Sequence, residues 1–152
     1  MSSATDIKKL REETGAGIMD CKKAMEEANG NYEKAKELVR QKGMLRAEKK
    51  ADRETKEGYI ASYTHATNKI GVLVEILCET DFVARNPEFQ TMARDVAMHV
   101  AAMKPADVAD LLSQEFIRDG SKTIEELVKE LSGKIGEKFV INRFVRFEVG
   151  QA

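Results

Sequence analysis

The chain has 152 residues, of which 42% are hydrophobic and 34% charged, a composition typical of a soluble globular protein with room for one ordinary domain or two small ones. No apolar run approaches the roughly 20 residues that a membrane-spanning helix needs, which excludes a bilayer span. The 25 basic residues are balanced by 26 acidic ones, for a net charge of -1. Nucleic acid is therefore disfavoured as a principal partner, because no overall attraction to phosphate backbones is expected.

The N-terminal stretch MSSATDIKKLREETG contains acidic residues and no apolar signal core. We therefore expect no secretory or organelle-targeting peptide and a cytoplasmic location. Cys21 and Cys78 stand far apart, with no CxxC pattern and no nearby histidine. Two reduced, packed thiols are expected, and not a disulfide or a metal site.

The first 44 residues predict three short helices. Thr5 or Asp6 can cap the first helix, and the glycines of the GAG turn at 15–17 end it. Asn31 is expected to cap the third helix and Gly43 to end it. The second helix presents one apolar face, formed by Ile18, Cys21, Ala24, Met25 and Ala28.

The run MLRAEKKADRETKE follows, with dense charge of alternating sign. Such a run fits an exposed helix or a mobile linker, so we interpret it as a domain boundary. The predicted organisation is a three-helix domain at 1–44, a charged linker at 45–57 and a second domain at 58–152.

After the linker the hydrophobic period changes to two. The alternation predicts strands over 59–64 and 70–79, joined by a turn at HATNK, as a hairpin with one apolar face. Asn86 and Pro87 predict the start of a helix that ends before Pro105. Its apolar stripe consists of Phe89, Met92, Ala93, Val96, Ala97 and Val100. We expect this helix to lie across the hairpin.

A weaker helical pattern lies near 108–112, and Thr123 and Glu126 have capping-box spacing for another helix, which Gly136 closes. The final segment KFVINRFVRFEV predicts a strand, interrupted by Arg143. Its apolar residues are expected on one side and are Phe139, Ile141, Val145, Phe147 and Val149. The predicted fold is α+β: a three-helix domain, then a three-stranded antiparallel sheet covered on one face by helices.

No residue pattern predicts an enzyme. His65, at a turn, and His99, on the polar side of the long helix, are in no nucleophile motif, and no phosphate-binding glycine loop is present. Glu75, Glu79 and Asp81 could line a metal site, but acids on the solvent face of a half-buried strand are commonplace. We therefore predict no catalytic residue, no metal and no cofactor.

The connection CETDFVARN places Asp81 and Phe82 side by side in a polar segment. Burial of a phenylalanine is worth about 1.5–3 kcal/mol, so an exposed one needs a reason. Phe82 could pack on Phe89 or Met92, or it could be held outward between a strand and a capped helix as a preorganised wedge for a partner. Met19, in a unit with little interior, is open to the same two interpretations.

Three stretches resemble the elongation factor Ts family. LREETGAGIMDCKKAMEEANGNYEKAKELVRQKG (10–43) is similar to its N-terminal, ubiquitin-associated-like three-helix domain. VEILCETDFVARNPEFQTMARDVAMHVAA (74–102) resembles its core, and KIGEKFVINRFVRFEVG (134–150) its closing helix and strand. Members are guanine nucleotide exchange factors for elongation factor Tu, the GTPase that brings aminoacyl-tRNA to the ribosome. The resemblance implies that this chain binds GDP-bound and nucleotide-free elongation factor Tu and promotes GDP release.

The resemblance also implies two sets of contact residues. One segment presses on the GTPase near its magnesium ion, displaces the helix that supports the ion and so weakens GDP binding. That segment consists of Thr80, Asp81, Phe82 and Val83. The N-terminal domain grips the nucleotide-binding domain of the GTPase. Its contact residues are Arg11, Ile18 and Met19.

The sequence departs from the family in one respect. Many members carry a second core half and a helical hairpin between the long helix and the closing helix, whereas here residues 105–127 form nearly the whole connection. Contacts that the missing half makes with the GTPase have no counterpart unless a homodimer supplies them. The alternative function is a non-catalytic protein-binding adaptor built on the ubiquitin-associated-like module, which has no need of TDFV. A nucleic-acid-binding module is disfavoured because there is no basic stripe.

Overall fold

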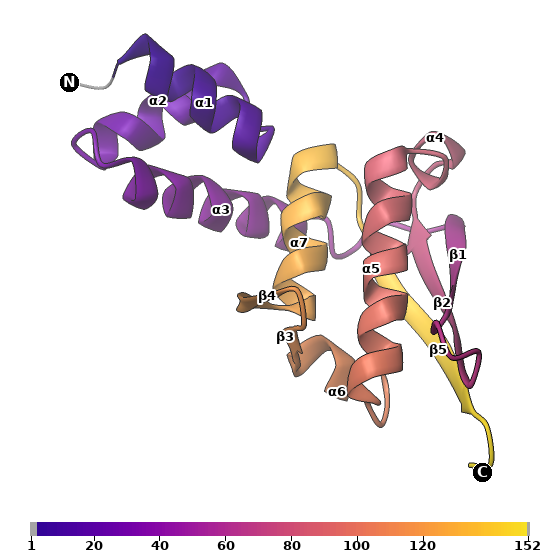
Figure 1. Cartoon of the computed structure of the whole chain (residues 1–152). Helices are drawn as coiled ribbons and strands as arrows, with labels where there is room; N and C mark the ends of the chain where they lie inside the picture. The colour runs from indigo at the N-terminus through magenta and orange to yellow at the C-terminus, as the bar shows by residue number, and fades with distance from the viewer. Residues whose placement is uncertain (1–2, 152) are drawn as a thin grey trace.

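The computed structural model describes residues 3–151, and its first part is a unit of three helices (Figure 1). They are α1 (Ala4–Thr14), α2 (Ile18–Glu27) and α3 (Tyr32–Glu48). Ser3, and not Thr5 or Asp6, caps α1, because its hydroxyl accepts a hydrogen bond from the Asp6 amide at 3.1 Å. Asn31 caps α3 as predicted, accepting from the amide of Lys34. The small core of the unit contains Leu10, Cys21, Ala24, Met25, Ala28, Ala35 and Val39.

Helix α3 continues past Gly43 to Glu48, so the prediction that Gly43 ends it was wrong. The reason is tertiary: Gly43 lies against helix α7 (Ile124–Ile135), and a Cβ atom at Gly133 would overlap the backbone carbonyl of Gly43. Glycine on both helices lets the two backbones approach closely. Part of the charged run is thus helical and packed on the second part of the chain, while the division into domains at 1–44 and 58–152 stays a prediction.

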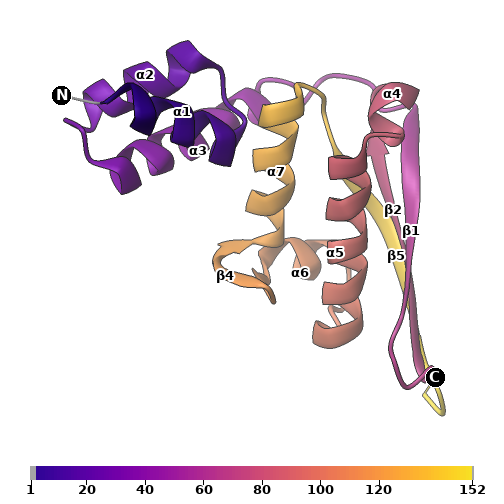
Figure 2. The ribbon, with the colours of Figure 1, turned by 45° about the horizontal axis from the view of Figure 1, so that its top comes forward.

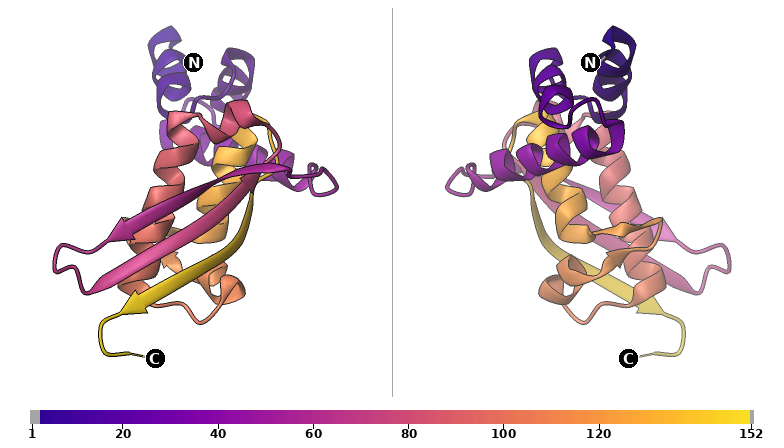
Figure 3. Two further views of the ribbon diagram at one scale, coloured as in Figure 1. Left: turned by 90° about the vertical axis from the view of Figure 1, so that its right-hand side faces the viewer. Right: turned by 90° about the vertical axis from the view of Figure 1, so that its left-hand side faces the viewer.

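The second part is an antiparallel sheet in the order β1-β2-β5 with helices on one face, which confirms the α+β prediction. Its strands are β1 (Glu57–Thr64), β2 (Ile70–Cys78) and β5 (Val140–Glu148). Helix α5 (Pro87–Met103) lies across β1 and β2 as expected. Figure 2 shows the layers in order: the sheet, then α5 and α7, then the N-terminal unit beyond α7. The left view of Figure 3 shows that the other face of the sheet is uncovered.

The predicted starts of α5 and α7 are those of the structure. Asn86 caps α5 by accepting from the amides of Glu88 and Phe89, with Pro87 in the first turn. Thr123 and Glu126 form the capping box of α7, and a short helix α6 (Val108–Ser113) precedes it. These are local interactions that span only three residues, so the sequence predicts them directly.

Strand β5 contains a bulge that the alternation did not predict. Glu75 pairs with Arg143 but Ile76 pairs with Ile141, which leaves Asn142 as an extra residue in β5. One extra residue reverses the faces on which the following side chains lie.

The prediction that all the apolar residues of this segment lie on one side was therefore wrong. Phe139 and Ile141 are buried beneath the helices. After the bulge, Phe144 packs against the core, and Arg146 donates two hydrogen bonds to the Ala101 carbonyl near the end of α5. The exposed residues are Val145, Phe147 and Val149.

A two-stranded hairpin, β3 (Glu115–Phe116) with β4 (Asp119–Thr123), joins α6 to α7 and was not predicted. It covers the side of α5 that carries His99, which is fully buried and not on a polar face as predicted. The His99 Nε2 atom lies 2.9 Å from Oε1 of Gln114, and Nδ1 accepts a hydrogen bond from the Ile117 amide at 3.2 Å. His99 thus ties the hairpin to α5.

Within residues 3–151, no helix is long and apolar enough to cross a membrane. Cys21 and Cys78 are both buried free thiols. Burial raises the pKa of both thiols, that of Cys78 to about 11, so both are protonated at neutral pH.

Candidate functional site

The TDFV segment (80–83) forms the cap and most of one turn of helix, α4 (Asp81–Ala84), which lies between β2 and α5. Thr80 caps it, with its hydroxyl accepting from the Val83 amide at 3.4 Å. Val83 and Ala84 pack into the core, whereas the side chain of Phe82 is 82% exposed. That exposure rules out packing of Phe82 on Phe89 or Met92, which are themselves buried.

Phe89 packs on Phe139 instead, with the two ring centroids 4.8 Å apart in an edge-to-face arrangement. Asp81 is exposed beside Phe82 and forms an ion pair with Arg85, one helical turn later, at 2.7 Å. Of the four residues predicted for this segment, Asp81 and Phe82 therefore face outward. Val83 anchors the turn, and Thr80 orients it.

The turn is anchored to the connection between α7 and β5. The carboxylate of Glu137 accepts hydrogen bonds from the backbone amides of Glu79 and Thr80 and from the Thr80 hydroxyl. In return, the Glu79 carboxylate accepts from the Lys138 amide at 2.6 Å, and it lies 3.4 Å from a guanidinium nitrogen of Arg53.

The second predicted set lies on the N-terminal unit. Ile18 and Met19, in the first turn of α2, are 54% and 59% exposed, and Arg11 is exposed in the last turn of α1. Ile18 belongs to the apolar face predicted for this helix, but it is exposed whereas Cys21 on the same face is buried. The structure leaves Ile18 and the neighbouring Met19 open to solvent.

Side-chain contacts connect the two sets. The GAG turn lies against Lys134 near the end of α7, since a Cβ atom at Gly15 would overlap the Lys134 side chain. Lys134 in turn forms an ion pair with Glu88 at 2.8 Å, in the first turn of α5 directly after α4. Figures 1 and 3 show the N-terminal unit and α4 at the same end of the molecule. The two sets are therefore linked through the side chain of Lys134.

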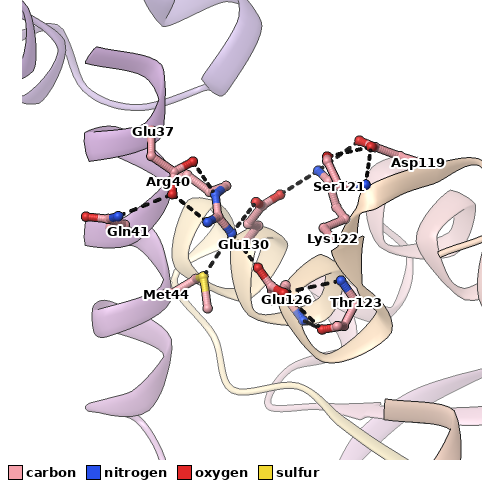
Figure 4. A network of polar contacts seen from close by, with 10 residues as sticks. All are labelled: Glu37, Arg40, Gln41, Met44, Asp119, Ser121, Lys122, Thr123, Glu126 and Glu130. Carbon is pink, nitrogen blue, oxygen red and sulfur yellow. Dashed lines mark hydrogen bonds and ion pairs between the residues drawn. The ribbon is translucent and has the colours of Figure 1, made fainter. Parts of the chain in front are cut away.

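Arg40 is the main polar link between the N-terminal unit and α7 (Figure 4). Its guanidinium donates to Glu126 at 2.7 Å and to Glu37, on its own helix, at 2.8 Å. The hydrogen bond from Arg40 lowers the pKa of both carboxyl groups, so all three are charged at neutral pH. Glu130 lies 3.6 Å from Arg40 and pairs with Lys122 of β4 at 2.8 Å.

No group of three His, Cys, Asp or Glu side chains that could hold a metal ion occurs in the described part of the chain. The three acids considered for a metal are engaged separately. Glu75 accepts from Asn142 at 2.6 Å, a bond that lowers the pKa of Glu75, and Glu79 and Asp81 have the partners given above. The geometry is that of an exposed aromatic side chain, Phe82, on a turn held by several hydrogen bonds.

Comparison with known proteins agrees with the resemblance in the sequence. A family model described as "Elongation factor TS" matches residues 79–152, which include α4, α5, α7 and β5. The chain is 44% identical to "Elongation factor Ts" of Thermosipho melanesiensis, over 99% of this chain and 100% of that protein. It is 42% identical to "Elongation factor Ts, chloroplastic" of Guillardia theta, over 98% of this chain and 89% of that protein.

The relatives differ from this chain in length. The alignment with the Thermosipho protein spans 196 residues, so that protein contains residues with no counterpart among the 152 of this chain. The protein of the same name from Aquifex aeolicus is 48% identical over 96% of this chain, which spans only 52% of the relative.

Proposed function

The chain belongs to the elongation factor Ts family, and from this premise we propose that it is a guanine nucleotide exchange factor that promotes GDP release from elongation factor Tu. The observation that carries the proposal is Phe82, 82% exposed on a capped turn between a central strand and the long helix. An aromatic side chain held outward on a rigid base is typical of a residue that anchors a protein interface. Exchange forms and breaks no covalent bond, so the chain is not an enzyme in the usual sense.

We propose that Asp81 and Phe82 press on the GTPase near its magnesium site, with Thr80 and Val83 holding the turn. Magnesium bridges phosphate oxygens and offsets their charge, so a disturbance of its coordination lowers the affinity for GDP. By reciprocity, GDP lowers the affinity of the GTPase for this chain by the same factor. Each tenfold change in affinity corresponds to about 1.4 kcal/mol, and a buried aromatic anchor can supply more than that.

Arg11, Ile18 and Met19 are proposed to bind the nucleotide-binding domain of the same GTPase molecule. The link through Lys134, which lies against Gly15 and pairs with Glu88, supports this, because two contact sets held together by the fold reinforce each other without further ordering. We place the chain in the cytoplasm with this partner, which it binds in GDP-bound and nucleotide-free forms.

A homodimer is proposed as the substitute for the missing second core half. The uncovered face of the sheet supports this proposal, since apolar side chains exposed in one patch mark an interaction site. They are Ile60 on β1, Leu73 on β2, and Val145 and Phe147 on β5. Leu73 and Val145 are paired in the register of neighbouring strands, so the patch is continuous from β2 to β5.

The test is the rate at which a fluorescent GDP leaves elongation factor Tu in a stopped-flow instrument. Strong acceleration by the wild-type chain that collapses for Asp81→Ala with Phe82→Ala supports both the function and the wedge. Ile117→Ala is the matched control, because Ile117 is also apolar and 48% exposed but lies on the β3–β4 turn. A folded wild-type chain that binds without accelerating release would refute exchange and leave the protein-binding adaptor.

A further inference from the structure

One carboxylate supports the turn that carries Asp81 and Phe82. Glu137 Oε1 accepts from the amide of Glu79 at 3.0 Å and from that of Thr80 at 3.1 Å, while Oε2 accepts from the Thr80 hydroxyl at 2.7 Å. Glu137 lies 57 residues further along the chain than Thr80, in the short connection between α7 and β5. The contact is therefore purely tertiary.

The two amides need this acceptor because the sheet no longer provides one. The pairing of β2 with β1 reaches Cys78 and its pairing with β5 reaches Leu77, so the amides of Glu79 and Thr80 lie beyond the ladder. Helix α4 has only four residues, too few for a helix to be stable on its own. The Thr80 hydroxyl relays the support, since it donates to Glu137 while accepting from the amide of Val83.

Glu137 is itself held in place from several sides. Its carbonyl accepts a hydrogen bond from the Ser132 hydroxyl at 2.5 Å. The neighbouring Lys138 amide donates to the Glu79 carboxylate at 2.6 Å, so Glu79 and Glu137 each bond to backbone amides of the other's segment. Arg53 closes the arrangement by donating to the Gly136 carbonyl at 3.2 Å and pairing with Glu79.

We infer that Glu137 is a positioning residue for exchange: it holds the strand end and the first turn of α4 so that Phe82 is presented to the GTPase in one geometry. The inference rests on the proposed function. Glu137 is half-buried beneath the turn and acts through Thr80. A turn that is already ordered before binding loses less conformational entropy when the complex forms. Removal of the Glu137 hydrogen bonds should therefore reduce both the maximal rate of GDP release and the affinity for the GTPase.

The first test compares Glu137→Ala with Glu137→Gln in the GDP-release assay. The alanine variant loses all three hydrogen bonds, and we expect its maximal acceleration to fall about tenfold, equivalent to about 1.4 kcal/mol. In the glutamine variant, the amide oxygen can accept both backbone bonds and the amide nitrogen can donate to Thr80, so most of the activity should return. Lys138→Ala is the matched control, because that side chain bonds the Ala51 carbonyl and not α4.

If Glu137→Ala does not fold, Glu137→Asp takes its place, since it keeps the charge but withdraws the carboxylate by one methylene. Hydrogen exchange supplies an independent readout. The amides of Thr80, Val83 and Ala84 should exchange faster in the alanine or aspartate variant, whereas the amides of β2 should keep their protection. Protection lost equally in β2 would indicate a general loss of stability and overturn the inference.

A double-mutant cycle with Phe82→Ala decides whether Glu137 acts through Phe82. Removal of Glu137 should then cost little further activity when Phe82 is already absent, whereas independent effects would multiply and overturn the inference. A Glu137→Ala variant as active as the wild type would overturn the inference alone. A wild-type chain without exchange activity would overturn the proposed function and, with it, this role of Glu137.

Discussion

The substitution Gly133→Ala tests the contact between the N-terminal unit and the second part of the chain. Gly133 lies on α7, where an added Cβ atom would overlap the backbone carbonyl of Gly43 on α3. Backbone atoms cannot rotate away, so the two helices must separate. A forced separation in a packed interface costs about 1–3 kcal/mol.

Gly43→Ala is the matched control, because a Cβ atom there has no neighbour within 4 Å. Both glycines lie inside helices, so replacement by alanine gains about 0.5–1 kcal/mol of helix propensity at either position. That gain cancels in the comparison. Gly133→Ala should therefore be less stable than Gly43→Ala by the full cost of about 1–3 kcal/mol.

The assay is urea denaturation of the two variants and the wild type, followed by helical circular dichroism. We expect Gly43→Ala to unfold at slightly higher urea than the wild type and Gly133→Ala at clearly lower urea than Gly43→Ala. The separation could instead detach the N-terminal unit from α7 without unfolding it. In that case Gly133→Ala should be cleaved faster after Lys49, and should bind elongation factor Tu more weakly, than the wild type. Equal stability of the two alanine variants, with unchanged proteolysis, would refute the close approach of α3 and α7.

Three further outcomes are expected. Arg40→Ala leaves Glu37 and Glu126 without their cation and should destabilise the chain by about 1 kcal/mol in urea denaturation. Arg40→Lys, which cannot bridge several carboxylates, should recover only part of the loss. Burial lowers the pKa of His99 below its usual 6.5, so below that pH the unfolded chain binds a proton that the folded chain does not. The free energy of unfolding should therefore fall as the pH drops below 6.5 towards the folded pKa, and a folded His99→Gln variant should show a smaller fall. Phe147→Lys should reduce self-association in sedimentation velocity. It should leave the melting temperature nearly unchanged, because Phe147 is 72% exposed in the single chain. A wild-type chain that sediments as a monomer would contradict the proposed dimer.

The features that the sequence predicted correctly depend on neighbouring residues. Asn31, Asn86 with Pro87, and Thr123 with Glu126 begin helices where expected, because a cap bonds amides two or three residues away. The two strands of the β1–β2 hairpin followed from alternation. The family resemblance, which rests on contiguous motifs, was confirmed by the comparisons.

Apart from the cap of α1, the wrong predictions concern residues whose role depends on distant parts of the chain. Gly43 looked like a helix end, but it allows the approach of α7, some 90 residues away. His99 looked exposed because the hairpin that covers it has little alternation of its own. The bulge at Asn142 reversed the later part of β5, and a one-residue irregularity leaves no mark in the hydrophobic pattern.

The sequence by itself determined the longer helices, the three strands of the main sheet, the fold class and the family, because these depend on periodicity, capping and local motifs, but it did not show α4 or the β3–β4 hairpin. Only the tertiary structure decided between the two interpretations of Phe82, since its exposure depends on the packing of Val83 and on the distant carboxylate of Glu137. It also decided that the GAG turn of the N-terminal unit and the start of α5 meet at Lys134, which lies against Gly15 and pairs with Glu88. Close approach and burial are properties of pairs of segments, and no single stretch of sequence contains both members of the pair.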